Sequence, residues 1–304
     1  MKKILIGSLL LLCVILFAEE SRSYRLINAD VGTATEIDGE RVMTLIGNVH
    51  FFYGETEFFS NTAELYDTKK ITKLSGDVRI IEDSLSLCAD NVTYLRLSEK
   101  LHFSGDVLIR EDHADSTFRT FAADSVNYYR QIGELEAHNN VTVFDERESI
   151  NGNCGFLKYD INDGYGYLLK RPEMCMQDSI KISAEKIEYF KEFSKIAANF
   201  DVITESPDFK ITSDFLLYFD IEQKAIFLGQ PKFISEYADA VADEIRIHFE
   251  EQKIQKAELE NNCKVEFSDE PNEKRESWIS SGQMQFYFSD GTIKVCDAME
   301  EVRS

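Results

Sequence analysis

The sequence of 304 residues contains few of the residues that interrupt a folded chain, with only four prolines and 15 glycines. This composition argues against disorder and against a chain of domains joined by linkers. Cations are also scarce: Lys and Arg total 33 against 55 Asp and Glu, which gives a formal net charge of −22. Since phosphate binding needs clustered cations, we expect no nucleic-acid partner and interpret the acidity as a means of solubility.

Motifs that carry chemistry are missing as well. The five histidines never form a His-x-x-x-His pair, and no nucleophile elbow, phosphate loop or Cys-x-x-Cys pair is present. The sequence therefore predicts no enzyme, no catalytic residue, no metal and no cofactor. Asp77 and Asp106 recur at equivalent positions and are interpreted as turn or edge carboxylates rather than calcium ligands. His50 and His102 are interpreted as solvated side chains.

The first 18 residues resemble an export signal. Lys2 and Lys3 precede an apolar run from Ile4 to Ala18, and polar residues follow. This order of basic, apolar and small residues predicts a signal peptide over residues 1–18 and export of the protein. The alternative is an uncleaved anchor, although the run of 15 residues is shorter than the roughly 20 that a membrane-spanning helix needs.

Five cysteines follow the signal, and an exported protein with an odd number cannot pair them all internally. They do not have the spacing of a zinc site. We interpret them as small buried hydrophobic residues. They are Cys88, Cys154, Cys175, Cys263 and Cys296.

One short pattern recurs at a fixed interval. LIGNVHF (Leu45–Phe51), LSGDVRI (Leu74–Ile80) and FSGDVLI (Phe103–Ile109) place their glycines 29 residues apart. Such self-similarity marks a repeat architecture. Within each copy apolar residues alternate with other residues, which is typical of a strand with one buried face. Weaker copies continue to Val302, so we predict a single domain over residues 24–304.

A second strand follows each copy, with a small residue, usually an acid next to it, and an aromatic residue five positions after the small one. Ala89, Asp90 and Tyr94 are the clearest example. The apolar phase slips by one residue inside this strand, which indicates a bulge or corner. Short polar turns between the alternating apolar runs indicate that neighbouring strands form hairpins. About eight such two-strand units predict an all-β fold of about 16–18 antiparallel strands, with negligible helix.

A fold grown by repetition is elongated, and two rolled or stacked sheets would enclose an apolar trough. We predict that the trough is lined by Val49, Phe51, Val78, Ile80, Val107, Ile109, Val141, Val143, Met174 and Val202. The first repeat strand, Thr44–Tyr53, and the last, Thr292–Val302, are expected to be open edges. Because neither contains a proline, both are suited to end-to-end strand pairing with another copy or with related partners.

The three glycine-centred strands, each followed by the small-acidic-x-x-x-aromatic strand, resemble the OstA/LptA-like periplasmic bridge proteins of lipopolysaccharide transport. This resemblance implies an open β-jellyroll that shields lipid A acyl chains, with lipopolysaccharide or a similar acylated lipid as ligand. It also implies stacking onto other β-jellyroll transport components. Two features depart from the family: the chain is longer than a minimal bridge protein, and its charge of −22 offers no evident basic patch for anionic headgroups.

Two other functions fit the same residues. The chain could be an acidic structural or adhesive β-repeat protein with a dry core, or a periplasmic adaptor that binds only proteins. The edges of the two sheets distinguish the lipid carrier from the structural protein. Closure of the sheets along both edges favours a structural role, and one splayed edge favours a lipid carrier.

Overall fold

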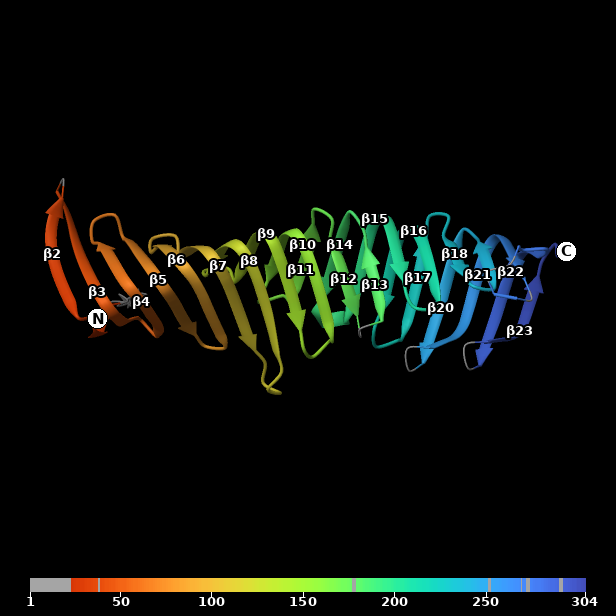
Figure 1. Ribbon diagram of the computed structural model, residues 1–304, viewed down its shortest axis with the longest axis horizontal. Helices are drawn as coiled ribbons and strands as arrows, with labels where there is room; N and C mark the ends of the chain where they lie inside the picture. Colours follow the sequence, from red (N-terminus) through yellow and green to blue (C-terminus); the bar gives the residue numbers. More distant parts are fainter. Residues whose placement is uncertain are drawn as a thin grey trace, which may run out of the picture.

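The computed structural model describes residues 23–37, 39–176, 179–250, 253–268, 270–271, 274–289 and 292–304. The strands follow one another along a single elongated body, with the first strands at one end and the C-terminus at the other (Figure 1). The predicted signal segment, residues 1–18, lies outside the described residues. Within the described residues, no helix is long and apolar enough to cross a membrane.

The described chain contains 23 strands and one 3-10 turn, η1 (Lys191–Phe193). The first twelve strands are β1 (Tyr24–Asn28), β2 (Val31–Ile37), β3 (Glu40–Tyr53), β4 (Thr56–Tyr66), β5 (Ile71–Glu82), β6 (Leu85–Leu95), β7 (Lys100–Asp112), β8 (Phe118–Tyr129), β9 (Glu134–Asp145), β10 (Ile150–Asp160), β11 (Tyr165–Leu169) and β12 (Glu173–Met176). The others are β13 (Ile180–Ser183), β14 (Lys186–Phe190), β15 (Lys195–Glu205), β16 (Phe209–Phe219), β17 (Lys224–Leu228), β18 (Lys232–Ser235), β19 (Ala238–Val241), β20 (Glu244–Glu250), β21 (Lys253–Phe267), β22 (Ser277–Ser289) and β23 (Thr292–Met299).

Consecutive strands pair antiparallel along the body, and some are two parts of one interrupted strand. In five places, two short strands that follow each other in the sequence pair with the two halves of one long strand. These are β11 and β12 along β10, β1 and β2 along β3, β13 and β14 along β15, β17 and β18 along β16, and β19 and β20 along β21. Counting each of these five pairs once reduces 23 strands to 18. The predicted all-β class and the predicted number of strands are therefore confirmed.

Every long strand bends near its middle, and the glycine-centred motif makes the bend. Gly76 and Asp77 both have positive φ, at 77° and 47°. Ser75 pairs with Asn91 and Val78 pairs with Ala89, so β5 has one residue more than β6 at this point. Glycine adopts positive φ without strain, and Asn and Asp tolerate it better than other residues. The same pair of left-handed residues occurs at Gly47-Asn48, Gly105-Asp106, Asn139-Asn140, Lys170-Arg171, Phe200-Asp201, Gly229-Gln230, Asn261-Asn262 and Glu300-Glu301.

The small-acidic motif of the neighbouring strand packs over this bend. A Cβ atom added to Gly105 would lie 2.3 Å from Oδ2 of Asp90, so that position admits only glycine without rearrangement. One repeat earlier, Nδ2 of Asn61 donates to Oδ2 of Asp77 at 3.0 Å. Asp77 therefore has the turn role that the sequence predicted. The phase slip in the second strand is also present, since Leu87, Ala89, Val92 and Tyr94 are all buried.

The bends divide each strand into two halves, which form two facing layers. Sheet A contains halves such as Ile71–Ser75 and Asn91–Leu95, and sheet B contains halves such as Val78–Glu82 and Leu85–Ala89. The backbone runs continuously from one sheet to the other along the row of bends, which we call the corner edge. Along the opposite side, the free edge, each sheet ends in its own turns.

Two predictions at the ends and at the cysteines are wrong. The segment Thr44–Tyr53 is not an open edge, because β1 and β2 pair with β3 along its length and β1/β2 form the end of the body. The last strand, β23, pairs only with β22 among the described strands and is the opposite end. Cys296 on β23 is exposed rather than buried.

The other four cysteines are more buried than Cys296, as the sequence predicted. Cys154 and Cys263 are buried, and Cys88 and Cys175 are half-buried free thiols. Burial raises the pKa of both Cys154 and Cys263 to about 11. A thiol with such a pKa is almost wholly protonated near neutral pH and is therefore unreactive.

Candidate functional site: the apolar interior and its free edge

The space between sheets A and B is filled by one apolar cluster that runs from Leu45 to Phe286. Of the ten predicted trough residues, nine are at most 4% exposed, and Val143 is half-buried against the same cluster. The intervening residues point outward, as Leu108 does with 44% of its surface exposed. The structure therefore places all ten predicted residues on the inner faces.

Among the described residues, the contacts that cross the free edge are made by side chains, and Arg130 makes one such connection. Its Nε donates to Glu82 on sheet B at 2.6 Å, and its Nη1 lies 3.3 Å from Glu99 in a turn of sheet A. Its Nη2 donates to Thr56 on sheet B. Burial works to lower the pKa of Arg130, but the bond to Glu82 raises it above the usual value, so the guanidinium stays charged.

Arg96 and Tyr24 make a second connection near the N-terminal end. The hydroxyl groups of Tyr24 on sheet B and Thr72 on sheet A are hydrogen-bonded to each other. The guanidinium carbon of Arg96 lies 5.1 Å from the ring centre of Tyr24, and Nη2 of Arg96 donates to the carbonyl of Tyr66 at 2.7 Å. Cation–π contacts of this kind stabilise by about 0.5–2 kcal/mol.

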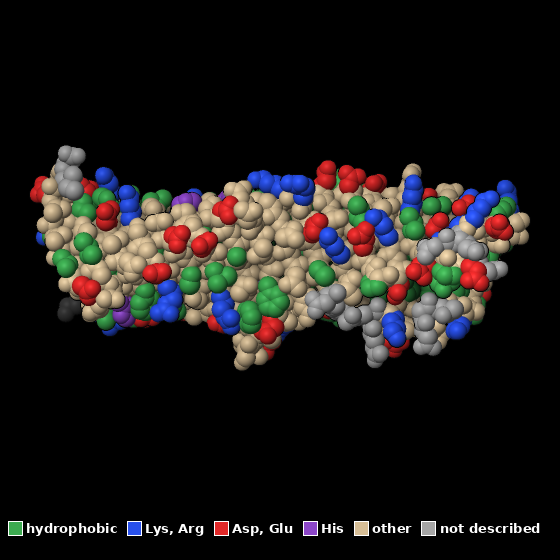
Figure 2. All heavy atoms as spheres, viewed as in Figure 1, with side chains coloured by type: hydrophobic (Ala, Val, Ile, Leu, Met, Phe, Trp, Pro, Cys, Tyr) green, Lys and Arg blue, Asp and Glu red, His purple; other side chains and the backbone are tan. Residues whose placement is uncertain are grey.

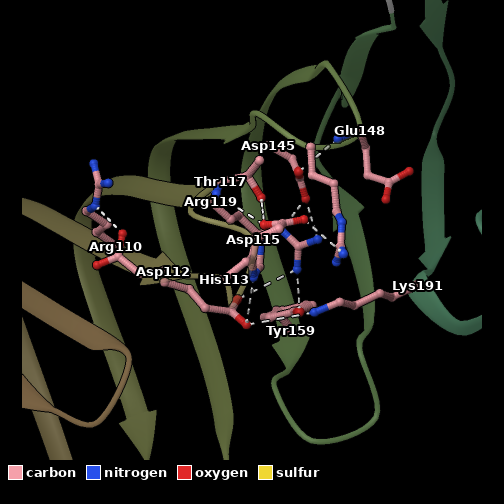
Figure 3. A network of polar contacts seen from close by, with 12 residues as sticks. Arg110, Asp112, His113, Asp115, Thr117, Arg119, Asp145, Glu148, Tyr159 and Lys191 are labelled. Carbon is pink, nitrogen blue, oxygen red and sulfur yellow. Dashed lines mark hydrogen bonds and ion pairs between the residues drawn. The ribbon is translucent and has the colours of Figure 1, made fainter.

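A third connection centres on Arg119, which is 3% exposed. Figure 3 shows its guanidinium directed toward Asp145 of the same sheet and toward Tyr159 of the opposite sheet. Nε of Arg119 donates to Asp145 at 2.6 Å. Glu111 lies 3.7 Å from Arg119, and Lys191 crosses the free edge to within 3.9 Å of Glu111. We call Glu111, His113, Arg119, Asp145, Tyr159 and Tyr189 the Arg119 cluster.

Burial governs the titration of this cluster. It raises the pKa of Tyr159 to about 12, although the positive charge of Arg119 works in the opposite direction. It also raises the pKa of Glu148 beside the cluster, with further increases from the negative charges of Asp145 and Asp220. Burial also raises the pKa of Tyr189, so both phenols stay neutral near neutral pH.

A cavity of about 40 Å³ lies beneath the Arg119 cluster. Arg119, Asp145, Tyr159 and Tyr189 are among its lining residues, together with apolar residues that include Phe121, Leu168 and Met174, and its surface is almost wholly apolar. Gly152 on β10 and Gly166 on β11 also line this cavity. Both lie at inward-facing positions and, as glycines, carry no side chain.

The sequence reasoning missed these bridging cations, although a signal exists. Arg96, Arg130 and Lys191 each stand two residues after the motif aromatic, in Tyr94-Leu95-Arg96, Tyr128-Tyr129-Arg130 and Tyr189-Phe190-Lys191. The motif aromatic ends a sheet A strand at the free edge, so a cation two residues later lies in the adjoining turn. Arg119 carries no such signal, because its partner Tyr159 is 40 residues away.

Ion pairs farther along the body join strands of the same sheet instead. Lys210 pairs with Glu205 at 2.7 Å on sheet B, and Arg246 pairs with Glu260 at 3.4 Å on sheet A. Their side chains are 29–48% exposed. Exposed pairs of this kind contribute about 1 kcal/mol or less.

A long antiparallel sheet folded along a corner edge around a continuous apolar interior defines an elongated β-jellyroll. A family described as "LptA/(LptD N-terminal domain) LPS transport protein" matches residues 26–195, which is more than half of the chain. The chain belongs to this family, as the resemblance in its sequence predicted.

Among solved structures, the chain is similar to LptH, the LptA-homologous periplasmic component of the lipopolysaccharide transport device of Pseudomonas aeruginosa. The two are 16% identical, with a TM-score of 0.38, and the match covers 40% of this chain and 94% of LptH. No curated protein matches the chain.

Proposed function

We propose that this protein is a periplasmic component of lipopolysaccharide transport, whose interior shields the acyl chains of the lipid from water. The observation that carries the proposal is the unbroken apolar cluster between the two sheets, since membership of the family alone does not say which surface meets the lipid. Burying acyl chains there is favourable by roughly 0.8 kcal/mol per methylene.

Figure 2 shows acidic and basic side chains interspersed with hydrophobic ones along the visible face. The interior is filled by the protein's own side chains, so an acyl chain must separate the two sheets in order to enter. The free edge is the place for this, because the corner edge is continuous backbone and the free edge is held by side chains.

Photo-crosslinking in cells tests the proposal. A benzophenone amino acid replaces Ile109, which is fully buried, and in a matched control it replaces the neighbouring outward residue Leu108. Lipopolysaccharide adducts are expected at Ile109 and not at Leu108. Adducts at Leu108 alone, or at neither position in a folded and exported protein, would contradict the proposal.

The packed interior also favours a second candidate, a structural β-repeat protein with a permanently dry core. The same experiment separates the two, because a dry core gives no lipid adduct at Ile109 or at Ile211, the fully buried interior residue on β16. Adducts at either inward position exclude the dry core.

The ends of the body support end-to-end assembly with other β-jellyroll components or with a second copy. Leu26, Ile27 and Val31 at one end, and Ile293 and Val295 at the other, are 43–51% exposed. Unpaired strand edges with apolar side chains recruit further strands. Since the charge of −22 opposes self-association at low salt, association should increase with salt.

Sedimentation at rising protein concentration and two salt levels measures this assembly. Val295→Lys, which places a charge on the edge strand, should weaken association, whereas Leu108→Lys, which adds the same charge at an outward position of β7, should not. A strict monomer in both buffers with every tested partner would refute the proposed stacking.

A further inference from the structure

Three buried polar atoms in the Arg119 cluster have no hydrogen-bond partner: Oε2 of Glu111, Nε2 of His113 and the hydroxyl of Tyr189. The side chains of His113 and Glu111 are only 7% and 10% exposed. A buried polar group without a partner costs about 1–3 kcal/mol, and most such groups in folded proteins are satisfied. Three of them around one arginine indicate a place built to meet a polar group from outside the protein.

Of the three residues that carry these atoms, Tyr189 lines the cavity, whose surface is almost wholly apolar. A Cβ atom added at Gly152 would have its nearest neighbours at 3.6 Å, so a larger residue would fit at its base. The absence of a side chain at this inward position leaves the interior locally underfilled. A ligand with an apolar body and a single polar group matches this division.

The charge balance decides which polar group fits. Glu111, Asp115, Asp145 and Glu148 place four carboxylates at or beside the cluster, against the cations Arg119, Arg147 and Lys191. The charge of Arg119 is already matched by Asp145, its neighbour on sheet B. A phosphate or carboxylate head would therefore meet net repulsion, whereas an ester, amide or hydroxyl oxygen would not.

We propose that the Arg119 cluster and the cavity beneath it form an acyl-chain entrance, in which the hydrocarbon occupies the space at Gly152 and an uncharged ester, amide or hydroxyl oxygen bonds to the Tyr189 hydroxyl. This inference rests on the proposed function and adds the position and chemical class of one subsite.

The cluster also explains how the entrance opens. A cavity of about 40 Å³ holds only one or two waters, so an acyl chain must separate the sheets here. Separation breaks the bond from Arg119 to Tyr159 and the approach of Lys191 to Glu111, both of which cross the free edge. The pair of Arg119 with Asp145 lies within sheet B and stays intact, so the arginine is never left as an unpaired charge.

Binding of small acyl probes to the purified chain tests the site. Displacement of a fluorescent naphthylamine probe is measured with methyl decanoate, which carries an uncharged ester, and with decyl phosphate. We expect methyl decanoate to bind at least tenfold more tightly than decyl phosphate. Gly152→Val should weaken methyl decanoate at least tenfold, and the control Gly32→Val on β2 should leave it unchanged.

Tyr189→Phe provides a second variant that removes only a hydroxyl without a protein partner, so the fold is preserved. With ¹³C-carbonyl methyl decanoate, the infrared carbonyl band should shift to lower wavenumber in the wild type and lose that shift in Tyr189→Phe. Tight decyl phosphate binding, or an unchanged affinity and carbonyl band in both variants, would overturn the assigned entrance.

The outcomes separate this inference from the proposed function. If methyl decanoate binds and both variants behave as wild type, the protein binds acyl groups elsewhere in its interior. Only the assigned position of the entrance is then wrong. If neither probe nor lipopolysaccharide binds to the folded wild type, both are wrong.

Discussion

Residues 24–195 and residues 196–304 are built from one repeat, but their free edges are held in different ways. In the first region Tyr24, Arg96, Arg130, Arg119 and Lys191 reach from one sheet to the other. In the second, pairs such as Lys210–Glu205 and Arg246–Glu260 stay within one sheet. The family match ends at residue 195, close to the last of these crossing cations. The repeat thus specifies the corner and the core, whereas the closure of the free edge is set by separate residues.

The largest difference between the regions should appear on removing an arginine from each. Arg119→Met leaves Asp145, which is 3% exposed, as an unpaired buried charge, and breaking such a pair costs about 3–5 kcal/mol. Arg246→Met removes two half-exposed ion pairs, with Glu244 and Glu260, and pairs of this kind contribute about 1 kcal/mol or less each. Urea unfolding measures both, and the double variant Arg119→Met/Asp145→Leu should recover most of the loss. Equal costs for Arg119 and Arg246 would remove the distinction between the two regions.

The core should show no such difference. Ile109 on β7 and Ile211 on β16 are both 0% exposed. Replacing either with alanine should cost about 2–5 kcal/mol, since each leaves a cavity among packed side chains. We expect the two costs to agree within roughly 1 kcal/mol in thermal or urea unfolding. A much smaller cost at Ile211 would show that the second region is loosely packed as well as loosely closed.

The corner should also behave alike in both regions. Gly105 and Gly229 have φ of 80° and 81°, and an added Cβ would lie 2.3 Å and 2.5 Å from the nearest Asp90 and Asp214 atoms. Gly→Ala at either site should destabilise by about 1–3 kcal/mol. Gly32→Ala, where the nearest atom is at 3.4 Å and φ is not positive, is the control and should change stability little. A tolerated alanine at one corner alone would show that the bend is not equivalent along the body.

The smallest effect concerns pH. Burial and the charges of Asp145 and Asp220 raise the pKa of Glu148 in the folded protein. A carboxyl with a raised folded pKa stabilises the fold below its unfolded pKa, near 4.3, and that contribution is lost as pH rises through the folded pKa. Glu148→Gln should therefore stabilise at pH 7, by less than about 1 kcal/mol, and flatten the decline above pH 4.5. Unfolding midpoints across pH 4–7 measure this, and a destabilised variant at pH 7 would contradict it.

Much of this fold follows from local pattern. The interval of 29 residues and the alternation around Gly76 and Gly105 predict strands, bends and inward residues, because these depend on neighbours within one repeat. The free edge is different, because the pairing of Arg119 with Tyr159 spans 40 residues and two sheets. The status of Thr44–Tyr53 as an inner strand likewise depends on the weakly patterned segment 24–37.

The most direct test of the account is the distance across the free edge when lipid binds. Spin labels at Ser84 and Ser98, which lie in exposed turns of sheets B and A beside the Arg130 bridge, report this distance in a protein whose native cysteines are replaced by alanine. A second pair, at Asp208 and Glu222, reports the free edge of the second region. Saturating lipopolysaccharide should lengthen the Ser84–Ser98 distance as the sheets part. Unchanged distances at both pairs, with lipid bound and crosslinked to Ile109, would show that the chains enter without opening the free edge and would contradict the account.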